Sequence, residues 1–182
     1  MRRKSMFAAL AVGAAALAVA AYALAGGSGT GFNHLTETLG GYQEVPSIST
    51  TGTATFTADV ANDGQSVSWQ MSYSALEGNI AQSHIHFGQR SVSGGIAVFL
   101  CTNLGNGPAG TQACPGPHDG SISGTFGPSD VIGPTAQGIG AGQWDELVKA
   151  IDAGKAYANI HSTIWPAGEI RAQLNETGDP HD

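Results

Sequence analysis

Two neighbouring stretches of the chain alternate between apolar and polar residues with a period of two. In 53–60 every second residue is Ala, Phe or Val, and in 67–73 Val, Trp, Met and Tyr fall on one side. This period is typical of β-strands that bury one face. Asn62-Asp63-Gly64 between them is a turn sequence. The two strands are therefore predicted to form a β-hairpin.

Shorter strand-like runs, separated by Gly-rich turns, cover most of the remaining chain. About eight short strands predict an all-β domain, an antiparallel β-sandwich or barrel. Residues 128–142 are expected to be irregular. The predicted strands besides the hairpin are His34–Leu39, a strand through His84 and His86, Gly95–Cys101, Gly120–Phe126, Lys155–Ser162 and Glu169–Leu174.

One segment has the helical period instead. Trp144, Leu147, Val148 and Ile151 stand at i, i+3, i+4 and i+7, which places them on one face of a helix, and Gly154 supplies its end. We expect one short helix packed against an edge of the sandwich.

The first 25 residues resemble an export signal. A basic start of Arg2, Arg3 and Lys4 precedes the uncharged, alanine-rich run 6–23, and Ala23-Leu24-Ala25 is a small-x-small cleavage pattern. We expect a cleaved signal peptide; a retained single-pass anchor is the alternative, since the run is about long enough to span a bilayer. Either interpretation places the domain outside the cytoplasm, secreted or periplasmic.

The remaining chain reads as a Gly/Ser-rich spacer over 26–34, one domain over 35–174 and a polar tail over 175–182. Asn175 lies in a glycosylation sequon, which matters only in a eukaryotic source. Without the signal peptide, four basic residues remain against 14 acidic ones, which argues against nucleic-acid binding. An extracellular or envelope partner is expected, with membrane contact only if the N-terminal segment is retained.

Cys101 and Cys114 are the two cysteines of the chain. In an exported protein an isolated pair indicates a disulfide. It would close a loop of about 14 residues and stabilise the fold by about 3 kcal/mol. Metal ligation by the thiols is the weaker alternative, because oxidation competes with it.

Three histidines are candidates for a metal site. His84 and His86 are two apart, so on a strand they project from one face roughly 6.5–7 Å apart, while Ile85 points to the other face. His161 lies in a second strand-like run. Three imidazoles with one open position suit copper or zinc.

The alternative is a metal-free extracellular binding or structural module in which these histidines belong to a buried polar network. Its partners would be Glu44, Asn159, Glu169 and Arg171. Glu169 could orient a ligand histidine, although a salt bridge with Arg171, two residues away, is the favoured role. Ring nitrogens converging within about 4 Å would favour the metal, and nitrogens saturated by carboxylates or carbonyls would favour the network.

The motifs together resemble the CHRD domain, named from the repeats of chordin. The resemblance spans 35–174 and rests on four segments in order: LGGYQEVP at 39–46, SHIH at 83–86, YANIHS at 157–162 and PAGEIRAQL at 166–174. It implies a secreted, immunoglobulin-like β-sandwich with distant kinship to copper–zinc superoxide dismutases. It implies no settled activity, and the growth-factor binding of chordin is not transferred.

The dismutase kinship can be compared residue by residue. The segment 84–88 resembles the copper-ligand strand of that family, and His161 could stand for its late copper ligand. For the bridging histidine and the zinc subsite the chain offers only His118 and Asp119, in a Gly/Pro loop. The full ligand set is absent, so dismutase activity is not expected, and no other catalytic constellation has useful spacing.

Overall fold

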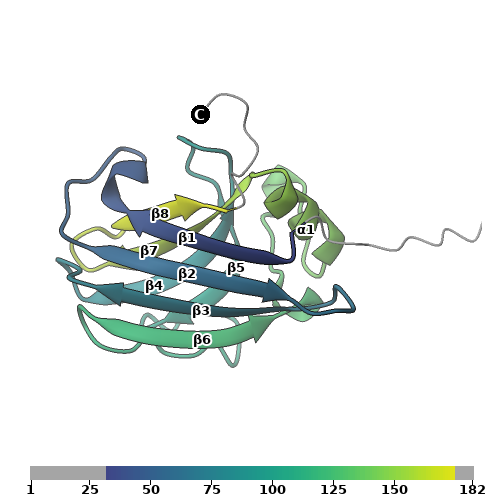
Figure 1. Cartoon of the computed structure of the whole chain (residues 1–182), viewed down its shortest axis with the longest axis horizontal. Helices are drawn as coiled ribbons and strands as arrows, with labels where there is room; N and C mark the ends of the chain where they lie inside the picture. The colour runs from purple at the N-terminus through teal and green to yellow at the C-terminus, as the bar shows by residue number, and fades with distance from the viewer. Residues whose placement is uncertain (1–31, 175–182) are drawn as a thin grey trace, which may run out of the picture.

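The structure, a computed structural model, describes residues 32–174 and forms one eight-stranded antiparallel sheet with a single α-helix (Figure 1). The predicted antiparallel sandwich or barrel with one short helix is confirmed. The strands are β1 (His34–Gly40), β2 (Thr53–Val60), β3 (Val67–Ser74), β4 (Ile80–Phe87), β5 (Gly95–Thr102), β6 (Gly120–Phe126), β7 (Ala156–Ser162) and β8 (Ile170–Gln173). The helices are α1 (Trp144–Asp152) and three 3-10 turns, Gly41–Gln43, Pro128–Asp130 and Thr135–Gln137.

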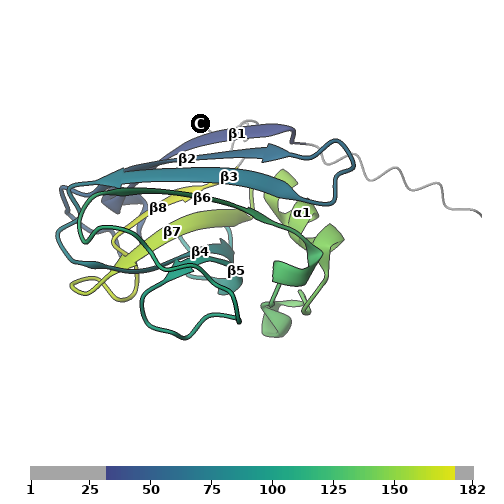
Figure 2. The same cartoon turned by 90° about the horizontal axis from the view of Figure 1, so that it is seen from below.

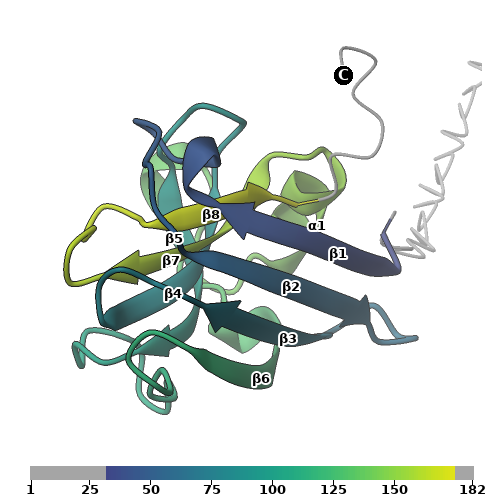
Figure 3. The same cartoon turned by 60° about the vertical axis from the view of Figure 1, so that its left-hand side comes forward.

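The sheet curls on itself in the order β5-β4-β7-β8-β1-β2-β3-β6. Figure 2 shows β1, β2, β3 and β6 as one layer above the other four strands, and Figure 3 shows the curl from β1 through β8 and β7 to β4. The edge strands β5 and β6 are bridged by a side chain, because Gln112 Nε2 donates to Leu100 O and Ser123 O, each at 3.2 Å. The result is a nearly closed barrel.

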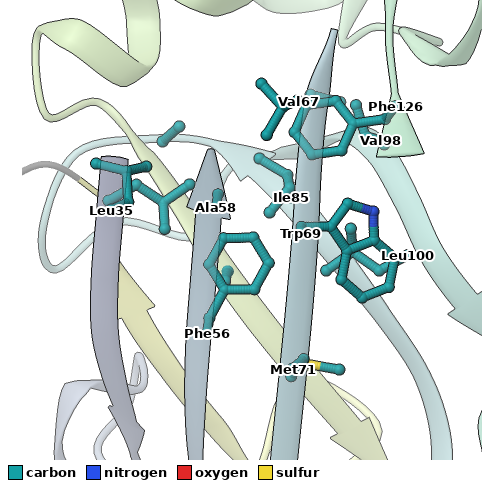
Figure 4. Close-up of a cluster of buried hydrophobic side chains, with 14 of the residues drawn as sticks. Leu35, Phe56, Ala58, Val67, Trp69, Met71, Ile85, Val98, Leu100 and Phe126 are labelled. Carbon is teal, nitrogen blue, oxygen red and sulfur yellow. The ribbon is translucent and has the colours of Figure 1, made fainter. Parts of the chain in front are cut away.

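The predicted hairpin is confirmed and supplies much of the core. In the β2–β3 pair Phe56 lies opposite Met71, and every second residue of β3 is buried. Figure 4 shows Phe56, Trp69 and Met71 pointing at Ile85 and Leu100 of the opposite layer. The period of two in the sequence is therefore the division between core and solvent.

Strand β7 behaves differently, because all seven of its residues are buried. Ala158 and Ile160 face the core. Tyr157, Asn159 and His161 alternate with them and so occupy the opposite face of the sheet. A second buried layer, outside the apolar core, therefore covers this part of the barrel.

Helix α1 packs at one end of the barrel (Figure 2) and buries the face predicted for it. Trp144 anchors it by donating from Nε1 to Gly64 O at 2.7 Å. The predicted disulfide joins Cys101 of β5 to Cys114 and ties down the loop between them. Between residues 32 and 174, no helix has the length and apolarity needed to cross a membrane.

Candidate metal centre

The three candidate histidines lie on two paired strands. In the β4–β7 register His84 is opposite Asn159, His86 is opposite Tyr157, and Gln82 is opposite His161. Residues directly opposite in an antiparallel pair share a face. All three imidazoles therefore project to the side of the sheet away from the core.

The loops that carry Gly94 and Pro166 contact the histidines from this side, and the loop closed by the disulfide packs on Phe99 beside His84, so the histidines are buried. His84 is 0% exposed, and His86 and His161 are each 6% exposed. We call this covered layer the polar face. Its side chains are His84, His86, Tyr157, Asn159, His161, Arg171 and Gln173.

The ring nitrogens converge. One nitrogen from each histidine lies within 4.8 Å of the other two. The closest approach is 3.4 Å, between Nε2 of His86 and Nε2 of His161. The nitrogens of this pair are within the separation of about 4 Å expected for two ligands of one ion, whereas the largest separation among the three histidines exceeds it somewhat.

The other ring nitrogens of this pair are fixed by backbone carbonyls. His86 Nδ1 lies 3.0 Å from Gly94 O, and His161 Nδ1 lies 3.1 Å from Pro166 O. A carbonyl oxygen only accepts, so each Nδ1 carries the proton and each Nε2 keeps a lone pair in the neutral ring. Two lone pairs thus face each other at 3.4 Å without a proton between them.

His84 differs from the other two because neither of its ring nitrogens has a hydrogen-bond partner, although both are buried. Its ring packs edge-on against Phe99, with centroids 4.3 Å apart. Buried polar atoms in folded proteins almost always have partners. His84 therefore brings unused ligand capacity to the same point as the other two Nε2 atoms.

Burial keeps the cluster uncharged. Burial lowers the pKa of His84 to about 2, and the neighbouring histidines lower it further. Burial also lowers the pKa of His86 to about 4, although the hydrogen bond to Gly94 acts to raise it. Burial also lowers the pKa of His161. All three rings are neutral at pH 7, the state in which an imidazole binds a metal.

A stack of side chains supports His86. The Tyr157 ring lies parallel to the His86 ring, with centroids 4.8 Å apart. The Arg171 guanidinium lies over the Tyr157 ring, with Cζ 3.7 Å from the centroid, which is a cation–π contact. Gly94 holds both rings, because its N–H donates to Tyr157 Oη at 3.0 Å while its carbonyl accepts from His86. A Cβ at Gly94 would clash with Phe87 O, so only glycine fits.

Tyr157, Phe99 and Gly94 were not among the residues predicted for the site. Tyr157 could have been predicted, because it stands four residues before His161 and so shares its strand face. Phe99 depends on the pairing of β5 with β4, and Gly94 acts through a backbone carbonyl. Neither role leaves a sequence signal.

The residues expected around the histidines divide into two groups. Glu169 is separate: it is 0% exposed and accepts from Thr50 Oγ1 at 2.8 Å and from the Glu77 N–H at 2.7 Å, which fixes the turn before β4. Asn159 and Arg171 lie on the polar face, opposite each other in the β7–β8 pair.

Glu44 joins the second group. Burial raises its pKa to about 7, against the lowering effects of Arg171, the Val45 amide and a hydrogen bond from Asn159. Its carboxylate and the Asn159 amide meet over Gly168, where a Cβ would lie 2.7 Å from both carboxylate oxygens and 2.8 Å from Asn159 Nδ2.

The other histidines lie elsewhere. His118 Nδ1 donates to Leu76 O at 2.8 Å in a loop, and His34 is exposed beside Asp59. His181 is outside the described residues. Within 32–174, the cluster of His84, His86 and His161 is the one group of three or more such side chains with ligand atoms close enough to share an ion.

Fold and site together define a class: a disulfide-linked antiparallel β-barrel domain that carries a buried histidine triad on its outer face. The family model of the CHRD domain matches residues 35–174, and the chain belongs to the CHRD domain family. No curated protein and no solved structure matches the chain.

Proposed function

We propose that this protein is an extracytoplasmic metal-binding domain that holds zinc or copper through His84, His86 and His161. Three neutral imidazoles with one open coordination position suit both metals. The open position would serve metal transfer or weak redox chemistry. Export is supported by the disulfide and by the N-terminal sequence, since disulfides persist in oxidising compartments.

The observation that carries the proposal is the pair of facing lone pairs on His86 and His161. Two imidazole nitrogens bound tetrahedrally to zinc at 2.0–2.1 Å lie about 3.3–3.4 Å apart. The observed separation of the two Nε2 atoms is 3.4 Å. Because both Nδ1 protons are committed to carbonyls, a cation is the natural occupant between the two Nε2 atoms.

His84 would complete the set by a small movement. Two ligands of one zinc ion are at most about 4.2 Å apart at these bond lengths, and the triad spans up to 4.8 Å. His84 is free to make this adjustment, because no hydrogen bond fixes either of its ring nitrogens.

Metal content measured by elemental mass spectrometry tests the proposal. Protein from an exporting, disulfide-forming host would be compared with a His84→Ala/His86→Ala/His161→Ala variant and with a His34→Ala control, whose histidine is exposed and outside the cluster. We expect one zinc or copper per chain in the parent and the control, and none in a folded triple variant. A parent that takes up neither ion after reconstitution with both would favour the metal-free binding or structural module.

A further inference from the structure

Unsatisfied polar atoms are concentrated in one part of the described chain. The buried side-chain nitrogens and oxygens of residues 32–174 without a hydrogen-bond partner are Glu44 Oε1, His84 Nδ1 and Nε2, Asn159 Oδ1 and Trp165 Nε1. Leaving such an atom unpaired is costly, because it has lost its hydrogen bonds to water without replacing them. Outside the His84 ring, only Glu44 Oε1 and Asn159 Oδ1 among these atoms are acceptors.

Asn159 is the acceptor placed beside His84. The two residues are directly opposite in the β4–β7 pair, so their side chains share the polar face with Cβ atoms about 4.5–5.5 Å apart. His86 and His161 each have an oxygen that holds the nitrogen turned away from the cluster centre, Gly94 O and Pro166 O. His84 is the one member of the triad without such an anchor.

The Asn159 amide is oriented by the groups on its far side. Its Nδ2 lies toward the Glu44 carboxylate, and the two meet where Gly168 leaves room for them. Gly168 has a φ of +136°, a conformation that glycine tolerates and side chains rarely adopt. Because Nδ2 is directed at a carboxylate, Oδ1 is the atom left to accept a hydrogen bond from a neighbour.

We infer that Asn159 is the positioning residue of His84: when the triad binds a metal ion, the ring N–H of His84 that faces away from the ion donates to Asn159 Oδ1, while Glu44 holds the amide. This inference rests on the proposed metal site. It gives each ligand histidine one oxygen anchor, two from the backbone and one from a side chain. Anchors of this kind fix the tautomer of a ligand and typically contribute 10–100-fold in metal affinity.

The test uses zinc and four versions of the full domain. Asn159→Leu removes the acceptor while keeping a side chain branched at Cγ, and Asn159→Asp keeps an acceptor. Gln82→Ala is the matched control, because Gln82 stands opposite His161 as Asn159 stands opposite His84, yet its Oε1 already accepts from Asn106. Zinc affinity would be measured by competition with a chromophoric chelator, and the His84 ring N–H would be followed by NMR in the zinc-loaded protein.

We expect Asn159→Leu to lose about 10–100-fold in zinc affinity, and the His84 ring proton to exchange rapidly with water while those of His86 and His161 persist. Asn159→Asp should retain binding and shift the His84 ring proton downfield, and Gln82→Ala should bind within about twofold of the parent. If Asn159→Leu does not fold, an unshifted His84 proton in Asn159→Asp overturns the inference.

Two failures remain distinguishable. A parent that binds zinc while Asn159→Leu matches it in affinity and in the His84 signal removes the role of Asn159 and leaves the metal site intact. A parent that binds no zinc removes both.

Discussion

The two halves of the sheet bury their residues in different ways. Burial alternates strictly in β3 and closely follows the same alternation in β2, so one face meets the core and the other is exposed or half-buried. In β4 and β7 burial is nearly continuous, and it includes three histidines and an asparagine. The first half behaves as an ordinary one-sided antiparallel sheet. The second carries an apolar face and a polar face, both covered.

The difference singles out the part of the sheet that carries the proposed metal site. Burying polar groups costs free energy unless each finds a partner, so the polar groups of a covered layer need partners that offset this cost. Gln173 is satisfied by protein groups alone. His84 and the facing Nε2 atoms of His86 and His161 are not, and this is the part of the layer that calls for a ligand.

The largest expected effect comes from truncating a core-facing side chain of β7, in the half of the sheet that is covered on both faces. Ile160→Ala removes a fully buried side chain between the two layers and should lower the free energy of unfolding by about 2–5 kcal/mol. Urea denaturation measures this. A loss below about 1 kcal/mol would contradict the tight packing of β7 between two covered faces.

The disulfide should contribute about 3 kcal/mol, because it closes a loop of about 14 residues. Its loop also covers part of the polar face, since Gly107 lies against Phe99, which packs on His84. A Cys101→Ser/Cys114→Ser variant compared with the parent by urea denaturation gives the value. An unchanged midpoint would show that the loop is ordered without the bond.

Metal binding should stabilise the folded state. At a free zinc concentration 100 times the dissociation constant the gain is about 2.7 kcal/mol, and it appears as a higher melting temperature in calorimetry. His86→Ala should abolish this gain. Zinc that stabilises the variant as much as the parent would place the ion elsewhere.

Acid should destabilise the protein through the same residues. Because the pKa values of His84 and His86 fall from 6.5 to about 2 and about 4, the unfolded chain takes up protons below pH 6.5 that the folded chain refuses. Between pH 6.5 and 4 each such histidine should lower the free energy of unfolding by about 1.4 kcal/mol per pH unit as the pH falls.

Glu44 works in the opposite direction. Its pKa is raised from 4.5 to about 7, so between these values the folded state keeps a proton that the unfolded state loses, and stability rises as the pH falls. The gain in stability from Glu44 as the pH falls therefore offsets the loss from about one histidine. Urea titrations from pH 7 to 5 should show a net loss of stability, and a steeper one in Glu44→Gln. A flat profile in both proteins would mean that the histidines are not held neutral.

The smallest effect belongs to the exposed side of the first half. Thr55→Ala on the exposed outer face of β2 should change the free energy of unfolding by no more than about 0.5 kcal/mol and leave zinc binding unchanged. Paired with Ile160→Ala in the same denaturation series, it measures the contrast between the two halves. A large effect would show that the outer face of β2 is covered in solution.

Most of the fold could be predicted from the sequence because most strands follow a local rule. The boundaries of β2 and β6 match the expected ranges, those of β1, β3, β5, β7 and β8 differ by one residue at one or both ends, and β4 contains His84 and His86 as expected. The helix could be predicted equally well, and its four apolar positions are buried.

The site was predictable only in part. The spacing of His84 and His86 places them on one face, but bringing in His161 required the β4–β7 register, which connects residues about 75 apart. The Glu169–Arg171 salt bridge favoured from the sequence stays a prediction, and Glu169 also accepts from Thr50 and from backbone amides near Glu77. Those amides lie far from Glu169 in the sequence and leave no residue-type signal.

X-ray absorption spectroscopy of the zinc-loaded domain shows directly whether the three histidines bind the ion. Three imidazole nitrogens are expected at about 2.0–2.1 Å from the ion, with the fourth position taken by an exchangeable ligand such as water. A shell of oxygen ligands without the outer scattering of imidazole rings would contradict it, and the buried histidines would then be a purely structural layer.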